Sequence, residues 1–269
     1  MGKKWCIRRL AVLLCFLAAL SLFAGCAPTD QNTAKPSMIP PDKNVLRVGV
    51  SANSPPLIFR QRNNIVGLEA DLARELAAYL GKTLRFVELK WDDQIPALLE
   101  NRIDIIMSGM TITRLRQVRI AFALSYFESG QMALVRRQDA ARFSTGLFTF
   151  ATSSAIGAIK DTTGAFFLES QFSSVKRKLY TNTGAAVKDL INKKIDMFIH
   201  DAPIILYLAS ENETRGLTDL FARLTKEPLA WGIRKDNGEL LDSANDFLRS
   251  FNKSGELSKV IKYWVPLAK

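Results

Sequence analysis

An α/β fold divided into two lobes is predicted by three features of the sequence. Strand-like and helix-like segments alternate from residue 45 onward, a pattern typical of a mostly parallel sheet with helices on both faces. These segments fall into two successive sets along the chain. A further strand and two helices follow the second set, so we expect two α/β units built from one chain.

The first set of elements lies between residues 46 and 107. Its clearest helix carries Leu68, Leu72, Leu76 and Leu80 on one face and meets a glycine stop at Gly81. We predict strands over 46–50, 84–89 and 103–107, and helices over 67–80 and 95–101.

The second set begins at residue 131. We predict strands over 131–135, 155–159, 178–181 and 195–199, and helices over 163–170, 185–192 and 203–210. A strand over 229–233 and helices over 239–251 and 257–264 come next. Two α/β units in one chain imply a cleft between them, and small ligands bind preferentially in clefts between domains.

The N-terminal residues predict a secretion leader rather than part of the fold. Four basic residues precede an uncharged apolar run from Leu10 to Ala24. This run is shorter than the roughly 20 residues that span a bilayer, so it is typical of a signal peptide. It ends in LFAGC, which resembles the bacterial lipobox and predicts acylation of Cys26 before cleavage. An ordinary signal peptide cut near Ala24, or an uncleaved anchor, remains the alternative.

Cysteine usage and composition agree with a lipid anchor. The cysteines are Cys6, Cys15 and Cys26, so only Cys26 would remain after cleavage and no internal disulfide can form. Residues 27–44 are rich in Pro, Thr, Asn and charge, which predicts a flexible tether. We expect a protein on the periplasmic or extracellular face, held to a membrane by a lipid such as palmitate on Cys26.

The positive charge does not indicate a nucleic-acid partner. Removing the four basic residues of the leader from the formal net charge of +11 leaves +7. These Lys and Arg residues are scattered, without a basic run or interleaved aromatics, so a solvated basic surface is expected.

Signatures of catalysis are mostly missing from the sequence. His200 is the single histidine and no thiol follows Cys26, which excludes Cys/His nucleophiles and histidine-based metal sites. No nucleophile elbow, phosphate-binding loop or dinucleotide fingerprint occurs. We therefore expect a binding module that has no catalytic residues, no metal and no cofactor.

Three stretches of the sequence carry a family resemblance. They are SGMTITRLR at 108–116, followed by SYF at 125–127, then KDTTG at 160–164 and HDAP at 200–203. Together they resemble the periplasmic solute-binding proteins of polar amino-acid ABC transporters. The resemblance extends over residues 45–269. It implies a type II periplasmic-binding-protein fold with two Rossmann-like lobes joined by two crossing segments. Lobe 1 would comprise residues 45–127 plus 228–269, and lobe 2 residues 132–224.

The resemblance also implies where the α-carboxylate of a ligand binds. Gly109, Thr111 and Arg116 take this role in the family pattern. Thr111 lies between a buried strand and a helix N-terminus, where anions are favoured, and the planar fork of Arg116 suits a carboxylate. The alternative is a threonine cap and an exposed helical arginine. Arg114-Leu115 departs from the family's acidic pattern and adds positive charge.

The second lobe supplies the other predicted ligand contacts. Asp201 ends a buried strand, where its carboxylate could meet the ligand ammonium group; capping of the helix at Pro203 is the alternative and does not exclude it. Lys160, Thr163 and Gly164 would bring the second lobe to the ligand carboxylate. Asp161 stands where the family often has glycine.

The pocket for the ligand side chain is less defined. Trp91 matches an aromatic position that covers the ligand in the family, with a tryptophan wedged into the core as the alternative. Ser54 replaces the family's aromatic residue before Pro55-Pro56, so we expect Ser51 and Asn53 to line that wall with polar groups.

The expected function is capture of an amino acid or similar small carboxylate by lobe closure. A monomer would then deliver this solute to the permease of an ABC transporter, as the resemblance implies. One rival is a ligand-sensing lipoprotein of a signalling system. The other is an exported enzyme similar to cyclohexadienyl dehydratase, with Glu69, Asp161 or Asp201 as its acid.

Overall fold

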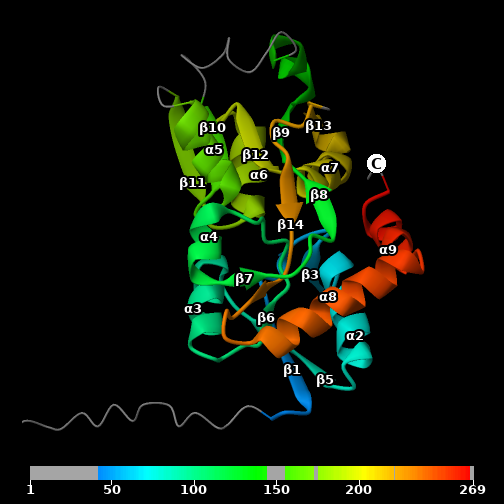
Figure 1. Cartoon of the computed structure of the whole chain (residues 1–269). Helices are drawn as coiled ribbons and strands as arrows, with labels where there is room; N and C mark the ends of the chain where they lie inside the picture. Colours follow the sequence, from blue (N-terminus) through cyan, green and yellow to red (C-terminus); the bar gives the residue numbers. More distant parts are fainter. Residues whose placement is uncertain (1–41, 144–154, 173–174, 221, 267–269) are drawn as a thin grey trace, which may run out of the picture. The chain divides into compact units, whose positions relative to one another are not determined.

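The computed structural model describes residues 42–143, 155–172, 175–220 and 222–266 (Figure 1). The leader, Cys26 and almost all of the predicted tether lie outside these residues. Within the described ranges, no helix combines the length and the apolar character that a membrane crossing requires.

Lobe 1 is built on a five-stranded sheet with the order β5-β1-β6-β15-β7. Its strands are β5 (Thr83–Glu88), β1 (Val45–Val50), β6 (Ile105–Ile106), β15 (Gly232–Ile233) and β7 (Ala121–Phe122). Its helices are α2 (Leu68–Tyr79), α3 (Gln94–Leu99), α4 (Arg114–Arg119), α8 (Gly238–Lys253) and α9 (Glu256–Trp264), with the short 3₁₀ helix η1 (Trp91–Asp93) before α3. A small sheet of β2 (Asn53–Ser54), β3 (Ile58–Gln61) and β4 (Asn64–Val66) packs against α2.

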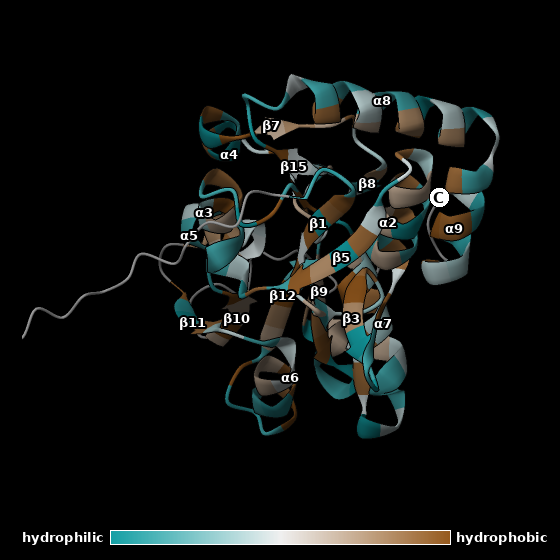
Figure 2. Ribbon diagram, turned by 90° about the horizontal axis from the view of Figure 1, so that it is seen from below, coloured by the Kyte–Doolittle hydropathy of each residue, from teal (hydrophilic) through white to brown (hydrophobic). Residues whose placement is uncertain are grey.

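Apolar spacing determines how the helices of lobe 1 pack. Leu68, Leu72 and Leu76 of α2 are fully buried, as their spacing of four predicts for one helix face. The long helix α8 carries both hydrophobic and hydrophilic residues along its length (Figure 2). It buries Phe247 and Leu248, and the ring of Phe247 stacks 6.1 Å from that of Trp231.

Lobe 2 repeats this arrangement with the sheet order β11-β10-β12-β9-β13. Its strands are β11 (Lys176–Tyr180), β10 (Ala155–Ile159), β12 (Met197–Asp201), β9 (Gln131–Arg136) and β13 (Leu217–Asp219). Its helices are α5 (Thr163–Gln171), α6 (Thr183–Ile191) and α7 (Ala202–Glu211), with 3₁₀ segments η2 (Arg137–Phe143) and η4 (Glu213–Arg215). The helix predictions in this lobe differ from these bounds by two residues at most.

Two crossing strands connect the lobes. β8 (Phe127–Ser129) and β14 (Glu227–Leu229) form an antiparallel pair in which Glu227 lies opposite Ser129. Figure 1 shows this pair between the two sheets. The type II periplasmic-binding-protein architecture predicted from the sequence is therefore confirmed, whereas the lobe boundaries given above stay a prediction.

Four strands of each sheet run in one direction, as predicted for a mostly parallel sheet, and one strand runs against them. Each sheet therefore has two parallel and two antiparallel pairings. The antiparallel members β15 and β9 are the strands by which the chain enters a lobe from the crossing pair. The predicted strand over 229–233 is divided between β14 and β15, since its first residues belong to the crossing pair and its last to the sheet.

Candidate functional site

A cavity of about 670 Å³ lies between the lobes and is lined by residues from both. This volume is within the range of small-molecule sites, about 300–1,000 Å³. Nine of the ten predicted ligand-binding residues line it: Ser51, Asn53, Trp91, Gly109, Thr111, Arg116, Lys160, Thr163 and Asp201. Gly164 does not line the cavity. A Cβ atom at this position would lie 2.7 Å from Gln131 Oε1, so Gly164 faces Gln131.

Arg116 is the buried cation of the site. It is the one buried residue of α4. The side chain of Thr113 caps this helix by accepting from the Arg116 N–H at 3.2 Å. The guanidinium donates from Nη1 to the carbonyl of Thr111 at 2.8 Å and lies 5.3 Å from the Trp91 ring centroid. The alternative of an exposed helical arginine is wrong, because Arg116 is only 9% exposed.

Asp201 ends β12 and occupies the cap position of α7, yet its side chain accepts no hydrogen bond from that helix. It accepts instead from Gln131 Nε2 at 2.6 Å. Burial raises the pKa of Asp201 to about 7, and the neighbouring Glu227 adds to this, while Gln131 and Arg116 oppose it. Asp201 is therefore a carboxyl group directed to the cavity rather than a helix cap.

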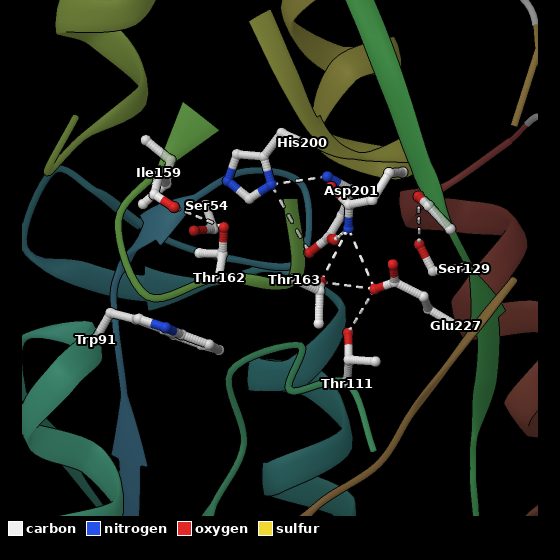
Figure 3. Close-up of polar contacts among 12 residues, drawn as sticks. Ser54, Trp91, Thr111, Ser129, Ile159, Thr162, Thr163, His200, Asp201 and Glu227 are labelled. Carbon is white, nitrogen blue, oxygen red and sulfur yellow. Dashed lines mark hydrogen bonds and ion pairs between the residues drawn. The ribbon is translucent and has the colours of Figure 1, made fainter. Parts of the chain in front are cut away.

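Glu227 is the centre of a polar network that the sequence did not predict. Its Oε2 accepts from the hydroxyl of Thr111 in lobe 1 at 3.0 Å and from that of Thr163 in lobe 2 at 2.6 Å (Figure 3). Gln131 Nε2 lies 3.2 Å from the same oxygen, and Thr225 donates to Oε1 at 2.7 Å. One carboxylate on the returning crossing strand thus joins predicted ligand-binding threonines of both lobes.

The charges of the site are complementary to a zwitterion. Burial lowers the pKa of Arg116, and the nearby carboxylates of Asp201 and Glu227 counteract this effect. Arg116 and Asp201 both line the cavity, and Glu227 hydrogen-bonds to Thr111 and Thr163, which also line it. A ligand with a carboxylate and an ammonium group on one carbon could pair with both signs.

Gly109 contributes through its backbone. Its φ of +67° is in the left-handed region, and a Cβ there would lie 2.8 Å from Leu57 Cδ1, so glycine suits the position. Its N–H donates to Glu69 Oε1 at 2.6 Å. That N–H is therefore engaged inside lobe 1 and is not available to donate to a ligand carboxylate.

The two lobes also meet beside Trp91. Its indole N–H donates to the carbonyl of Asp161 in lobe 2 at 2.9 Å. Asp161 has a φ of +60°, a conformation that favours glycine, which explains why the family often has glycine here. Lys160 is exposed, and its Nζ lies 3.6 Å from the Asp161 carboxylate.

Polar groups line the wall where the aromatic residue is missing. The Ser51 hydroxyl donates to the carbonyl of Leu89 at 2.9 Å, and Ser54 donates to Asn53 Oδ1 at 3.2 Å. Trp91 has two roles, because it lines the cavity and also packs against the core cluster around α3.

The fold and the site together define a class of protein. A two-lobed α/β fold with a cavity of mixed charge between its lobes is the architecture of an extracytoplasmic solute-binding protein. The chain belongs to the bacterial extracellular solute-binding proteins, family 3, whose model matches residues 46–266. This confirms the resemblance that the motifs indicated, and the chain is accordingly an amino-acid-binding protein of this type.

Relatives in this family bind different amino acids. The chain is 28% identical to the arginine-binding extracellular protein ArtP of Bacillus subtilis, over 97% of this chain and 98% of that protein. It is 26% identical to the L-cystine-binding protein TcyJ of Escherichia coli, over 83% of each. An ancestral amino acid-binding protein, a precursor of cyclohexadienyl dehydratase, superposes with a TM-score of 0.77 at 30% identity, covering 82% of this chain and 95% of that one.

Proposed function

We propose that this protein captures an amino acid by closure of its lobes and releases it unchanged to the permease of an ABC transporter. The observation that carries this proposal is that the buried Arg116 of lobe 1 and Asp201 of lobe 2 line one cavity. The relatives named above support it, since they bind arginine and L-cystine. We further propose that the protein acts as a monomer on the extracytoplasmic side of the membrane.

The cavity suggests how each end of an amino acid is held. The Arg116 fork uses one N–H on Thr111, and its remaining donors can take the ligand carboxylate. The ligand ammonium group would lie against Asp201, which lines the cavity. Several charge-assisted bonds of about 1.5–3 kcal/mol each are enough for micromolar binding, about −8 kcal/mol.

Closure follows from the division of these groups between the lobes. Arg116 and Thr111 belong to lobe 1, whereas Asp201 and Thr163 belong to lobe 2. A ligand that touches both sets gains contacts only in the closed form, and this differential contact shifts the population towards it. The hydrogen bond from Trp91 to the Asp161 carbonyl joins the two lobes and would also stabilise the closed form.

Calorimetric titration with the twenty proteinogenic amino acids and L-cystine tests the proposed function. We expect at least one Kd of about 1 μM or lower, and the bound compound should be recovered chemically unchanged by chromatography. The matched control is the amine that lacks the α-carboxylate of the best ligand, which should bind at least about 100-fold more weakly because it cannot pair with Arg116. Failure of every amino acid to bind, or equal binding of the amine, would contradict the proposal.

We also propose that Cys26 carries the lipid anchor, since it is the cysteine that ends the lipobox-like sequence LFAGC. In cells fed labelled palmitate, the Cys26→Ser protein should carry no label and should partition into the aqueous phase of a detergent extraction. Cys15→Ser is the matched control and should keep both the label and the detergent partitioning. A label that persists in Cys26→Ser would place the lipid elsewhere.

A further inference from the structure

Glu69 is a buried carboxyl group outside the cavity lining. It lies in the first turn of α2 and is fully inaccessible to solvent. Its Oε1 accepts from the Gly109 N–H and from the Tyr126 hydroxyl, each at 2.6 Å. Its Oε2 accepts from the Trp231 indole N–H at 3.0 Å. Two oxygens therefore satisfy three donors.

The three donors belong to parts of the chain that would have to act together in binding. Gly109 lines the cavity. Tyr126 directly precedes the crossing strand β8, and Trp231 follows the crossing strand β14. One side chain thus links the loop that faces the ligand to the lobe 1 ends of both crossing strands.

Neighbouring contacts make this linkage direct. The Ile112 N–H donates to the Pro228 carbonyl at 2.9 Å, and the Ala230 N–H donates to the Met110 carbonyl at 3.0 Å. The segment after Gly109 is therefore paired with the returning strand. The rings of Tyr126 and Trp231 are stacked with centroids 5.8 Å apart, which fixes the two strand ends against each other.

We propose that Glu69 is a positioning residue that couples the ligand loop at Gly109 to the hinge at Tyr126 and Trp231. The proposal rests on the proposed function, because it concerns how the same cavity binds its ligand. Glu69 touches no ligand itself; it sets the Gly109–Thr111 backbone and the direction in which both crossing strands leave lobe 1. In its ionised form the carboxyl group fits this role, because both of its oxygens accept and neither donates.

Glutamine tests this requirement with almost no change in shape. An amide offers one accepting oxygen and one donating NH₂ group, so at least one of the three donors then faces another donor. We expect Glu69→Gln to raise the Kd at least about tenfold for the amino acid that wild type binds most tightly in the titrations above. Glu75→Gln, on the exposed side of the same helix, should leave the Kd unchanged.

A second substitution separates positioning from general damage to the core. If the glutamine NH₂ opposes the indole N–H, then Trp231→Phe removes that opposition and keeps an aromatic ring. Glu69→Gln/Trp231→Phe should therefore bind at least about threefold more tightly than Glu69→Gln alone, although Trp231→Phe by itself weakens binding. Tyr126→Phe, which loses only a hydroxyl, should weaken binding about threefold or more and serves if Glu69→Gln does not fold.

The outcomes are distinguishable. Wild-type affinity in Glu69→Gln or Tyr126→Phe, or purely additive losses in the double variant, would overturn the coupling role while the proposed function stands. If wild type binds no amino acid, the proposed function fails, and this inference fails with it.

Discussion

Replacing Arg116 by alanine should weaken amino-acid binding at least about 100-fold, because the ligand carboxylate loses its buried partner and faces two acids instead. This factor corresponds to about 2.8 kcal/mol of binding free energy. The free protein should lose no more than about 2 kcal/mol of unfolding free energy, since the main losses are one hydrogen bond to Thr111 and the contact with Trp91. Calorimetry gives the first quantity and urea denaturation the second.

Arg114→Ala is the matched control for Arg116→Ala. Arg114 is in the same short helix but exposed, so its removal should change affinity only slightly. Retained binding in Arg116→Ala, or complete loss of the folded state, would show that Arg116 has a structural rather than a ligand-binding role.

Replacing Asp201 by asparagine should have opposite effects on binding and on stability. Loss of the ammonium partner should weaken binding at least about 30-fold. The free protein should become more stable at pH 8, because burial raises the pKa of Asp201 from 3.8 to about 7, so ionisation at pH 8 costs folding free energy. The gain has an upper limit of about 4 kcal/mol. Asparagine keeps an oxygen that can accept from Gln131.

The sign of the pH dependence follows from proton binding. Between about pH 4 and 7 the folded state holds a proton on Asp201 that the unfolded state has released, so this group lowers stability as pH rises through that window. Asp201→Asn should therefore exceed wild type by more near pH 8 than near pH 5 in urea denaturation, because only about a third of that window has been crossed at pH 5. Asp246→Asn, an exposed change on α8, should show no such difference. Equal effects at both pH values would contradict the assignment.

Glu69 and His200 also contribute to the pH dependence of stability, and the comparison of Asp201→Asn with wild type separates the Asp201 contribution from theirs. Burial raises the pKa of Glu69 to about 7, although its three hydrogen-bond donors oppose the shift. Burial lowers the pKa of His200 to about 4, which makes stability rise with pH between about 4 and 6.5. The Glu69 contribution is common to wild type and Asp201→Asn, so it cancels in the difference. His200 Nδ1 lies 3.8 Å from the Asp201 carboxyl group, and the measurements are therefore made at pH 5 and pH 8, both above the pKa of about 4 of folded His200.

Local sequence patterns predicted the elements of this fold well because apolar spacing and strand–helix alternation are local properties. The leucine spacing identified α2, and the turn motifs at 108–116 and 200–203 identified side chains that the structure brings to one cavity. Whether Arg116 is an exposed helical residue and whether Asp201 is a helix cap depend on burial and on hydrogen bonds, and no local sequence pattern contains this information.

Contacts between distant segments could not be predicted in this way. Glu227 is 116 residues from Thr111 and 64 from Thr163, and only the crossing of the chain between lobes brings the three together. Glu227 precedes Pro228 at a strand start, a position that carries no chemical signature. Gly164 is not among the residues that line the cavity, although its neighbour Thr163 is, because the space beside Gly164 is occupied by Gln131.

The order of strands in lobe 1 has a consequence for synthesis of the chain. β15 lies between β6 and β7 in the sheet, although it comes more than a hundred residues after them. The sheet of lobe 2 is formed by the continuous stretch from β10 to β13 together with β9, all made earlier. Domains fold as units while the chain emerges. The lobe that begins first is therefore the last to be completed, and the binding cavity exists only once residue 233 has been made.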